Sequence, residues 1–131
     1  MCYAGPQQLP HILASLVSHG RPADESAAIV YDGTLPTQQT VTGTLSELTE
    51  TLKSSEDRRA AILIVGRVVA LRDHLRWFDS RPLFGKRILV TRPREHASDL
   101  AELLEAMGAE AIEAPMIRII PPEDYGPLDE A

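Results

Sequence analysis

The first part of the chain alternates between apolar residues at helical spacing and short apolar runs. A helical stripe follows Gln8, and a proline in the first turn, with Gly20 and Pro22 after the stripe, predicts where this helix begins and ends. The period of three and four residues places the apolar positions on one face. They are Leu9, Ile12, Leu13, Leu16 and Val17.

The segment after this helix predicts two strands joined by a turn. Residues 27–31 (AAIVY) form an apolar run that indicates a buried strand, and Gly33 marks the turn. Residues 38–45 (QQTVTGTL) are rich in β-branched threonine and valine. Such residues favour a strand, which we expect to be antiparallel to its neighbour.

A second helix is predicted to begin at Thr44, because Thr44 and Glu47 have the spacing of a capping box. A solvated loop is expected over 54–59 (SSEDRR) and a central strand over 60–66 (AAILIVG). A closing helix is expected over 68–78 (VVALRDHLRWF). Its apolar face would carry Leu71, Leu75 and Phe78, while Leu45, Leu48 and Leu52 support the helix after Thr44.

The pattern changes at DSRPLFGKR, where Pro82 and Gly85 interrupt it. A strand from Arg87, an amphipathic helix ending at Gly108 and a further strand predict a β-α-β unit with a parallel, right-handed crossover. One such unit does not enclose a core, so we interpret it as the opening of a longer domain. The predicted division is a first unit over 1–79, a linker over 80–86 and a second unit over 87–131. The apolar face of the helix that ends at Gly108 comprises Ala97, Leu100, Ala101, Leu104 and Met107.

Charge and composition narrow the classes of partner. The net charge is −6, with 13 Lys and Arg against 19 Asp and Glu, so the basic excess that binds phosphate backbones is absent from the sequence. We therefore expect a small-molecule or protein partner and no nucleic acid. No apolar run is long enough to suggest a membrane span. The single Cys2 forms no internal disulfide, which suits the cytoplasm, where we expect the protein.

The titratable residues predict neither a catalytic group nor a metal site. The histidines are scattered, without the spacing of paired metal ligands, and Cys2 has no base nearby in sequence. The pairs Arg58-Arg59 and Arg72-Asp73 are interpreted as solvated, and Trp77-Phe78 as core or interface. The histidines are His11, His19, His74 and His96.

Two glycines are more informative. Gly33 follows a buried strand, and Gly43 lies ten residues on, among neutral threonine and glutamine. A glycine at a strand end can take a positive φ and lets a ligand approach the backbone. The neighbouring polar groups could bind a ribose or an adenine. A plain turn explains the same residues, and residue types alone leave both interpretations open.

Residues 2–78 as a whole resemble the C-terminal half of S-adenosylmethionine-dependent uroporphyrinogen-III C-methyltransferases, in the tetrapyrrole methylase family. The resemblance is carried by CYAG, where the family has Tyr-Met-Gly, by the block from LPHILASLVSHG to TGTL, and by AAILIVGRVVALRDHLRWF. Residues 81–131, including TRPREHASDL, resemble the start of uroporphyrinogen-III synthase. A methylase followed by a synthase is a known fusion.

The resemblance implies an α/β fold: a methylase second lobe, with a mixed sheet and helices, followed by the β-α-β start of a synthase. In the family the cofactor lies between two lobes. Gly33 is then expected to contact S-adenosylmethionine through its backbone. Ala4 stands at the family's methionine position, without the thioether that packs on the cofactor, and Ala28 matches a further cofactor-lining position.

The function implied by the resemblance is methylation of uroporphyrinogen III, a tetrapyrrole, on the siroheme and cobalamin branch, by a homodimer. We expect the chain to be inactive alone, because the first lobe and most of the synthase lie outside it. An alternative of another class is a non-enzymatic, self-associating assembly module. A unit of about 80 residues has a small core, and its strand edges are open.

Overall fold

The computed structural model describes residues 1–55, 59–118 and 120, with the backbone alone for 94–97. Helices and strands alternate, which confirms the α/β fold class. None of the helices in these residues is both long enough and apolar enough to span a bilayer. The elements are β1 (Cys2–Ala4), α1 (Leu9–Ser18), β2 (Ser26–Tyr31), β3 (Gln39–Thr44), α2 (Leu45–Ser54), β4 (Ala61–Val65), the 3-10 helix η1 (Arg67–Leu71), α3 (Arg72–Leu75), β5 (Arg87–Val90), α4 (Arg94–Ala106) and β6 (Glu110–Glu113).

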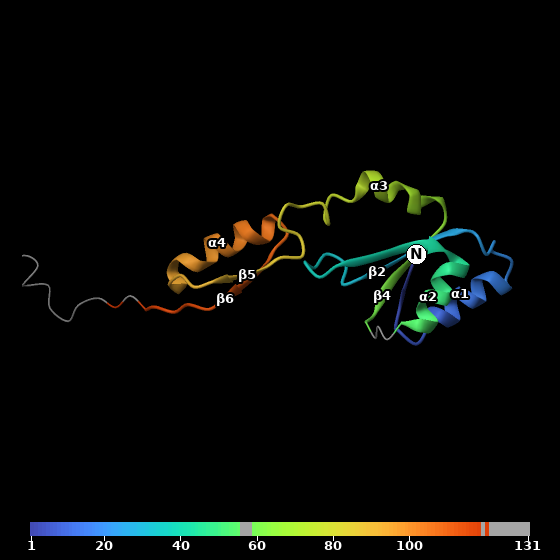
Figure 1. The fold of residues 1–131 in the computed structure, drawn as a ribbon, viewed down its shortest axis with the longest axis horizontal. Coiled ribbons are helices and arrows are strands. Elements are labelled where there is room, and N and C mark those ends of the chain that lie inside the picture. Colours follow the sequence, from blue (N-terminus) through green and yellow to red (C-terminus); the bar gives the residue numbers. More distant parts are fainter. Residues whose placement is uncertain (56–58, 119, 121–131) are drawn as a thin grey trace, which may run out of the picture.

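The sheet of the first unit has the strand order β1-β4-β2-β3 within the described residues, and its neighbouring strands are antiparallel. The antiparallel pairing of β2 with β3 and the interior place of β4 confirm the sequence prediction. The edge strand β1 was not predicted. Helices α1 and α2 lie on one side of this sheet and α3 lies on the other (Figure 1).

The core lies between the sheet and helices α1 and α2. Alternate residues of β2 face these helices, namely Ala27, Ile29 and Tyr31, and each is at least 95% buried. The largest fully buried side chains are Leu9, Leu13, Ile29, Leu45, Leu48 and Leu63. Burial of each contributes about 1.5–3 kcal/mol, so the helical stripes predicted from spacing supply most of the packing.

The start of α2 is the predicted capping box. The Glu47 N–H donates to Thr44 Oγ1 at 3.2 Å, and the Thr44 N–H donates to Glu47 Oε2 at 2.8 Å. The hydrogen bond from the Thr44 backbone lowers the pKa of Glu47, with a smaller contribution from the Thr44 side chain. A Cβ built on Gly43 would lie 3.0 Å from Glu47 Oε2. Gly43 therefore leaves room for the capping carboxylate.

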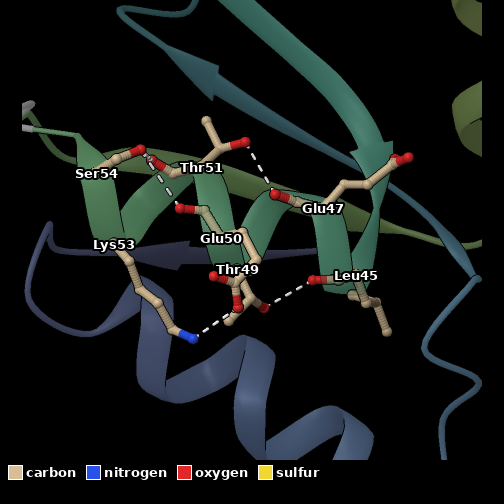
Figure 2. A network of polar contacts seen from close by, with 7 residues as sticks. All are labelled: Leu45, Glu47, Thr49, Glu50, Thr51, Lys53 and Ser54. Carbon is tan, nitrogen blue, oxygen red and sulfur yellow. Dashed lines mark hydrogen bonds and ion pairs between the residues drawn. The ribbon is translucent and has the colours of Figure 1, made fainter.

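The threonines of α2 favour a helix that relies on its cap. Figure 2 shows the Thr49 and Thr51 hydroxyls donating to the carbonyls of Leu45 and Glu47, at 2.7 and 2.9 Å. Hydroxyls bonded back to the preceding turn are neutral or slightly unfavourable inside a helix, and β-branched residues form helices less readily. Lys53 pairs with Glu50 at 2.7 Å across an exposed surface, which adds little.

The helix predicted over 68–78 is wrong in extent. The chain forms η1 and the single-turn α3, and Leu71 and Leu75 are 49% and 64% exposed. Local sequence does not support a longer helix, because the β-branched pair Val68-Val69 lies in its first turn and the N-cap residues of η1 and α3 make no side-chain hydrogen bond. After α3, the aromatic pair packs on Arg81, whose guanidinium carbon lies 4.9 and 4.7 Å from the ring centres of Trp77 and Phe78.

In the described part of the second unit, the chain runs from β5 through α4 to β6. Strands β5 and β6 pair in parallel, as predicted. Ala101 of α4 is buried and Leu100 and Leu104 are half-buried, whereas Met107 is 39% exposed. The predicted stop at Gly108 is confirmed by its φ of 96°. Residues 119 and 121–131, the end of this predicted unit, lie outside the described residues, as do residues 56–58 of the predicted loop and the side chains of His96 and Ala97.

The segment predicted as a linker, 80–86, contacts the end of α4. The Leu83 N–H donates to the Met107 carbonyl at 3.0 Å, and the Glu110 N–H donates to the Lys86 carbonyl at 2.8 Å. A Cβ on Gly108 would lie 3.2 Å from the Phe84 backbone. These contacts attach the segment to the second unit, and the division of the chain stays a prediction.

Replacing the cap residue tests the dependence of α2 on it. Thr44→Ala removes the oxygen that accepts the Glu47 N–H, so we expect the free energy of unfolding in urea to fall by about 1 kcal/mol. Thr44→Ser keeps the oxygen and should stay near the wild type. Equal losses in the two variants would show that the oxygen is not what stabilises this helix start.

Candidate functional site

The turn after β2 is the site that the sequence singled out. Its left-handed residues are Asp32, with φ 49°, and Thr34, with φ 69°. Gly33, for which the sequence suggested a positive φ, lies between them without one. A Cβ on Gly33 would meet Val30 Cγ1 at 3.7 Å and Ile62 Cδ1 at 3.8 Å, which is ordinary contact. The fold therefore tolerates a methyl group at this position.

Hydrogen bonds within the turn order its backbone. The Leu35 N–H donates to the Asp32 carbonyl at 3.0 Å, and the Gln38 N–H donates to the Leu35 carbonyl at 2.9 Å. These are two successive turns of the i to i+3 type. The Thr34 N–H donates to Gln38 Oε1 at 2.8 Å. These three hydrogen bonds contribute to the path of the segment.

Arg59, which the sequence suggested was solvated, contacts both ends of this turn. Its Nη1 donates to Asp32 Oδ2 at 2.5 Å and its Nη2 donates to Gln39 Oε1 at 2.6 Å. The guanidinium carbon lies 4.8 Å from the centre of the Tyr31 ring. The Arg59 and Asp32 side chains are 34% and 25% exposed, so this ion pair contributes no more than about 1 kcal/mol. Its partner in the predicted pair, Arg58, lies outside the described residues.

The three predicted cofactor residues do not all face the same way. Ala28 is buried on the sheet face opposite α1 and α2, where Val30 and Ile62, the neighbours of Gly33, also lie. Ala4 pairs with Ala61, and both belong to the core on the helix side of the sheet. The structure thus brings Ala28 and Gly33 to one face and directs the side chain of Ala4 to the other.

Ala28 lines a cavity of about 230 Å³ between the sheet, η1 and α3. The lining is mostly apolar, and the hydroxyl of Thr40 has no hydrogen-bond partner among the described residues. Two arginines reach this cavity, Arg72 and Arg76, and both form ion pairs with Asp79. Such a site can hold an apolar group beside one hydroxyl. The apolar lining residues are Ala28, Val30, Ile64, Val68, Val69, Leu71 and Leu75.

The turn also borders an open cavity of about 640 Å³. Gln38, Gln39 and Arg59 lie on one side of it, and Lys86 and Arg87 lie on the other. Arg87 is paired with Glu110 at 2.9 Å. The carboxylates of Asp32 and Glu110 also line this space and pair with Arg59 and Arg87, so its lining combines amides and paired charges.

The described residues hold no group of three His, Cys, Asp or Glu side chains arranged to bind a metal ion. Cys2 is half-buried and packs against the core. The turn itself combines main chain, the small residue Gly33 and the side chain of Arg59, while Arg72 and Arg76 reach the neighbouring cavity.

No family model matches the chain. The chain is 38% identical over 117 residues to the porphyrin biosynthesis protein HemD of Ruminiclostridium josui, covering 89% of this chain and 23% of that protein. It is 31% identical over 116 residues to the uroporphyrinogen-III C-methyltransferase of Bacillus subtilis (strain 168), covering 88% and 24%. It is 39% identical over 99 residues to a siroheme synthase of Thiobacillus denitrificans, covering 76% and 20%.

The names of these relatives refer to porphyrin biosynthesis, to methylation of uroporphyrinogen III and to siroheme synthesis, in line with the resemblance described from the sequence. The mixed α/β structure of the first unit is consistent with a lobe of such a methylase. The chain spans about a quarter or less of the length of these relatives.

The strained backbone of the turn gives a test of its geometry. A β-branched residue with positive φ is unfavourable, so Thr34→Gly should keep the free energy of unfolding or raise it by up to about 1 kcal/mol. Thr37→Gly, at an exposed position of the same turn without positive φ, should lower it by about 0.5–1 kcal/mol. Urea denaturation measures both. Equal losses would contradict the left-handed assignment of Thr34.

Proposed function

We propose that this chain contributes one wall of an S-adenosylmethionine site in a protein that methylates uroporphyrinogen III, on the siroheme and cobalamin branch. The observation that carries the proposal is the similarity, over 88% of the chain, to a protein named for this methylation. Similarity to proteins named siroheme synthase supports the same pathway. The expected location is the cytoplasm.

The cofactor contacts proposed for this wall are Gly33, Ala28 and Ala4. Gly33 has no side chain beyond its backbone and lies in an ordered turn, so a ligand can approach its peptide groups closely. Ala28 lies on the same sheet face and would contribute a small apolar contact. Because the Ala4 side chain is in the helix-side core, its contact would come from the main chain.

The chemistry of methyl transfer explains why one wall is insufficient. A methyl group moves from a sulfonium to a carbon nucleophile when the two are held in line and water is excluded. A substrate with eight carboxylates also needs several arginine or lysine contacts. In the first unit Arg59 and Arg72 already pair with Asp32 and Asp79. We therefore propose that the chain is inactive alone and that residues outside it supply the second wall and most substrate contacts.

We further propose that residues 81–131 begin a uroporphyrinogen-III synthase fused to the methylase. The alignments with the first two relatives span 117 and 116 residues, more than the first unit contains, so they extend beyond it. The parallel β5-α4-β6 arrangement is of the kind that opens an α/β domain. Both features support the fusion.

The cofactor proposal is tested by titrating the chain with S-adenosylhomocysteine in a calorimeter. We expect weak binding by the wild type and at least tenfold weaker binding by Gly33→Ala, because the added methyl group occupies the approach to the backbone. The fold accommodates this methyl group at 3.7–3.8 Å, so circular dichroism and the unfolding midpoint should change little.

Any of three results would contradict this proposal. The first is that the wild type does not bind S-adenosylhomocysteine. Equal affinity of Gly33→Ala and the wild type would remove Gly33 from the cofactor wall. Methyl transfer to uroporphyrinogen III by this chain alone, above the background rate, would contradict the division of the site between two walls.

A second candidate function is self-association, as a homodimer or a larger assembly. The observation that favours it is the exposure of apolar side chains on η1 and α3: Val68 is 53%, Leu71 49% and Leu75 64% exposed. A group of neighbouring apolar side chains that are exposed to solvent is typical of a surface that contacts another protein.

Sedimentation velocity over a hundredfold range of concentration tests self-association. We expect the sedimentation coefficient to rise with concentration, and Leu75→Glu to suppress that rise because it places a charge in the contact. Val17→Glu, at an exposed position of α1 on the other side of the sheet, is the matched control. A monomer at every concentration would exclude this candidate.

A further inference from the structure

One guanidinium group closes the turn that carries Gly33. Arg59 donates one hydrogen bond to Asp32, where the turn leaves β2, and another to Gln39, where β3 begins. Tyr31 and Gln39 are paired residues of the β2-β3 ladder, and the guanidinium also stacks on the Tyr31 ring. The contacts therefore bridge the two ends of one hairpin from outside it, since Arg59 precedes β4.

We propose that Arg59 is a positioning residue, which holds the turn over 32–39 in the conformation that presents the Gly33 backbone to the cofactor. This inference rests on the function proposed above. Arg59 need not touch the ligand in this role. It acts through Asp32 and Gln39, whose separation determines the path of the residues between them.

The turn needs such a residue because its backbone is unfavourable by itself. Asp32 and Thr34 both have positive φ, and a β-branched residue rarely adopts that conformation unless its surroundings impose it. Without the bridge the turn would sample other conformations. The apparent affinity for a ligand falls by the fraction of molecules whose turn is competent to bind.

Lysine cannot replace arginine in this arrangement. The planar guanidinium directs two N–H donors at two acceptors at once, whereas an ammonium is a compact point charge on a flexible stem. Arg59→Lys keeps the charge, and we expect its single nitrogen to bond Asp32 without also reaching Gln39, because it lacks the two nitrogens with which the guanidinium spans both acceptors. Comparison of Arg59→Lys with Arg59→Ala thus separates the charge from the geometry.

The experiment combines amide hydrogen exchange with S-adenosylhomocysteine titration on the full chain. In Arg59→Ala and Arg59→Lys the hydrogen-bonded amides of Thr34, Leu35 and Gln38 should exchange about tenfold faster, while the amides of β2 and β4 keep their protection. The dissociation constant for S-adenosylhomocysteine should rise about tenfold in both variants. Arg21→Ala is the matched control, because it removes an arginine paired with Glu25 outside this turn.

Three results would overturn the inference: turn amides that exchange as in the wild type, a uniform rise in exchange across the sheet, or full restoration by lysine. The uniform rise would mean that Arg59 acts only on global stability. If the wild type does not bind S-adenosylhomocysteine, the proposed function fails. The exchange of the turn amides still decides whether Arg59 orders this segment, so the two failures are distinguishable.

Discussion

The arrangement of the first unit depends on β2 being enclosed on both faces and paired on both edges. The backbone of β2 forms hydrogen bonds with β3 on one edge and with β4 on the other. Its side chains point alternately toward the helices α1 and α2 and toward the opposite face of the sheet, which η1 covers. Small residues at Ala27 and Ala28 allow close approach from either side, and both are buried. The turn that follows Tyr31 therefore begins from a strand that cannot shift its register without exposing the core.

Most elements could be predicted because each carries a strong local pattern. The stripes of α1 and α2, the apolar runs of β2 and β4 and the capping box are all readable within a few residues. The edge strand β1 has only three residues and no recognisable pattern. The helix over 68–78 was predicted too long, because spacing does not reveal that Arg72 pairs with Asp79 or that Trp77 turns toward Arg81.

The candidate site was predictable only in part, for a similar reason. Gly33 was predicted as a site residue because it is a glycine at a strand end. The positive φ values are at Asp32 and Thr34 instead, and they depend on the conformation of the whole turn. Arg59 lies 27 positions from Asp32 and resembled any exposed cation beside a polar loop. The one available signal was its position just before a buried strand. The direction of Ala4 depended on the pairing of β1 with β4, which the sequence did not disclose.

Gly43 shows how a strand position can come to depend on a helix. A Cβ there would lie 3.0 Å from Glu47 Oε2, so the carboxylate would have to shift by a few tenths of an ångström, and any cost would fall on the start of α2 while β3 kept its ladder. The cost would also vary with residue 47, because a shorter side chain there would leave free the space that the glutamate carboxylate occupies. Substitutions at positions 43 and 47 are thus expected to be coupled, although one position lies in a strand and the other in a helix.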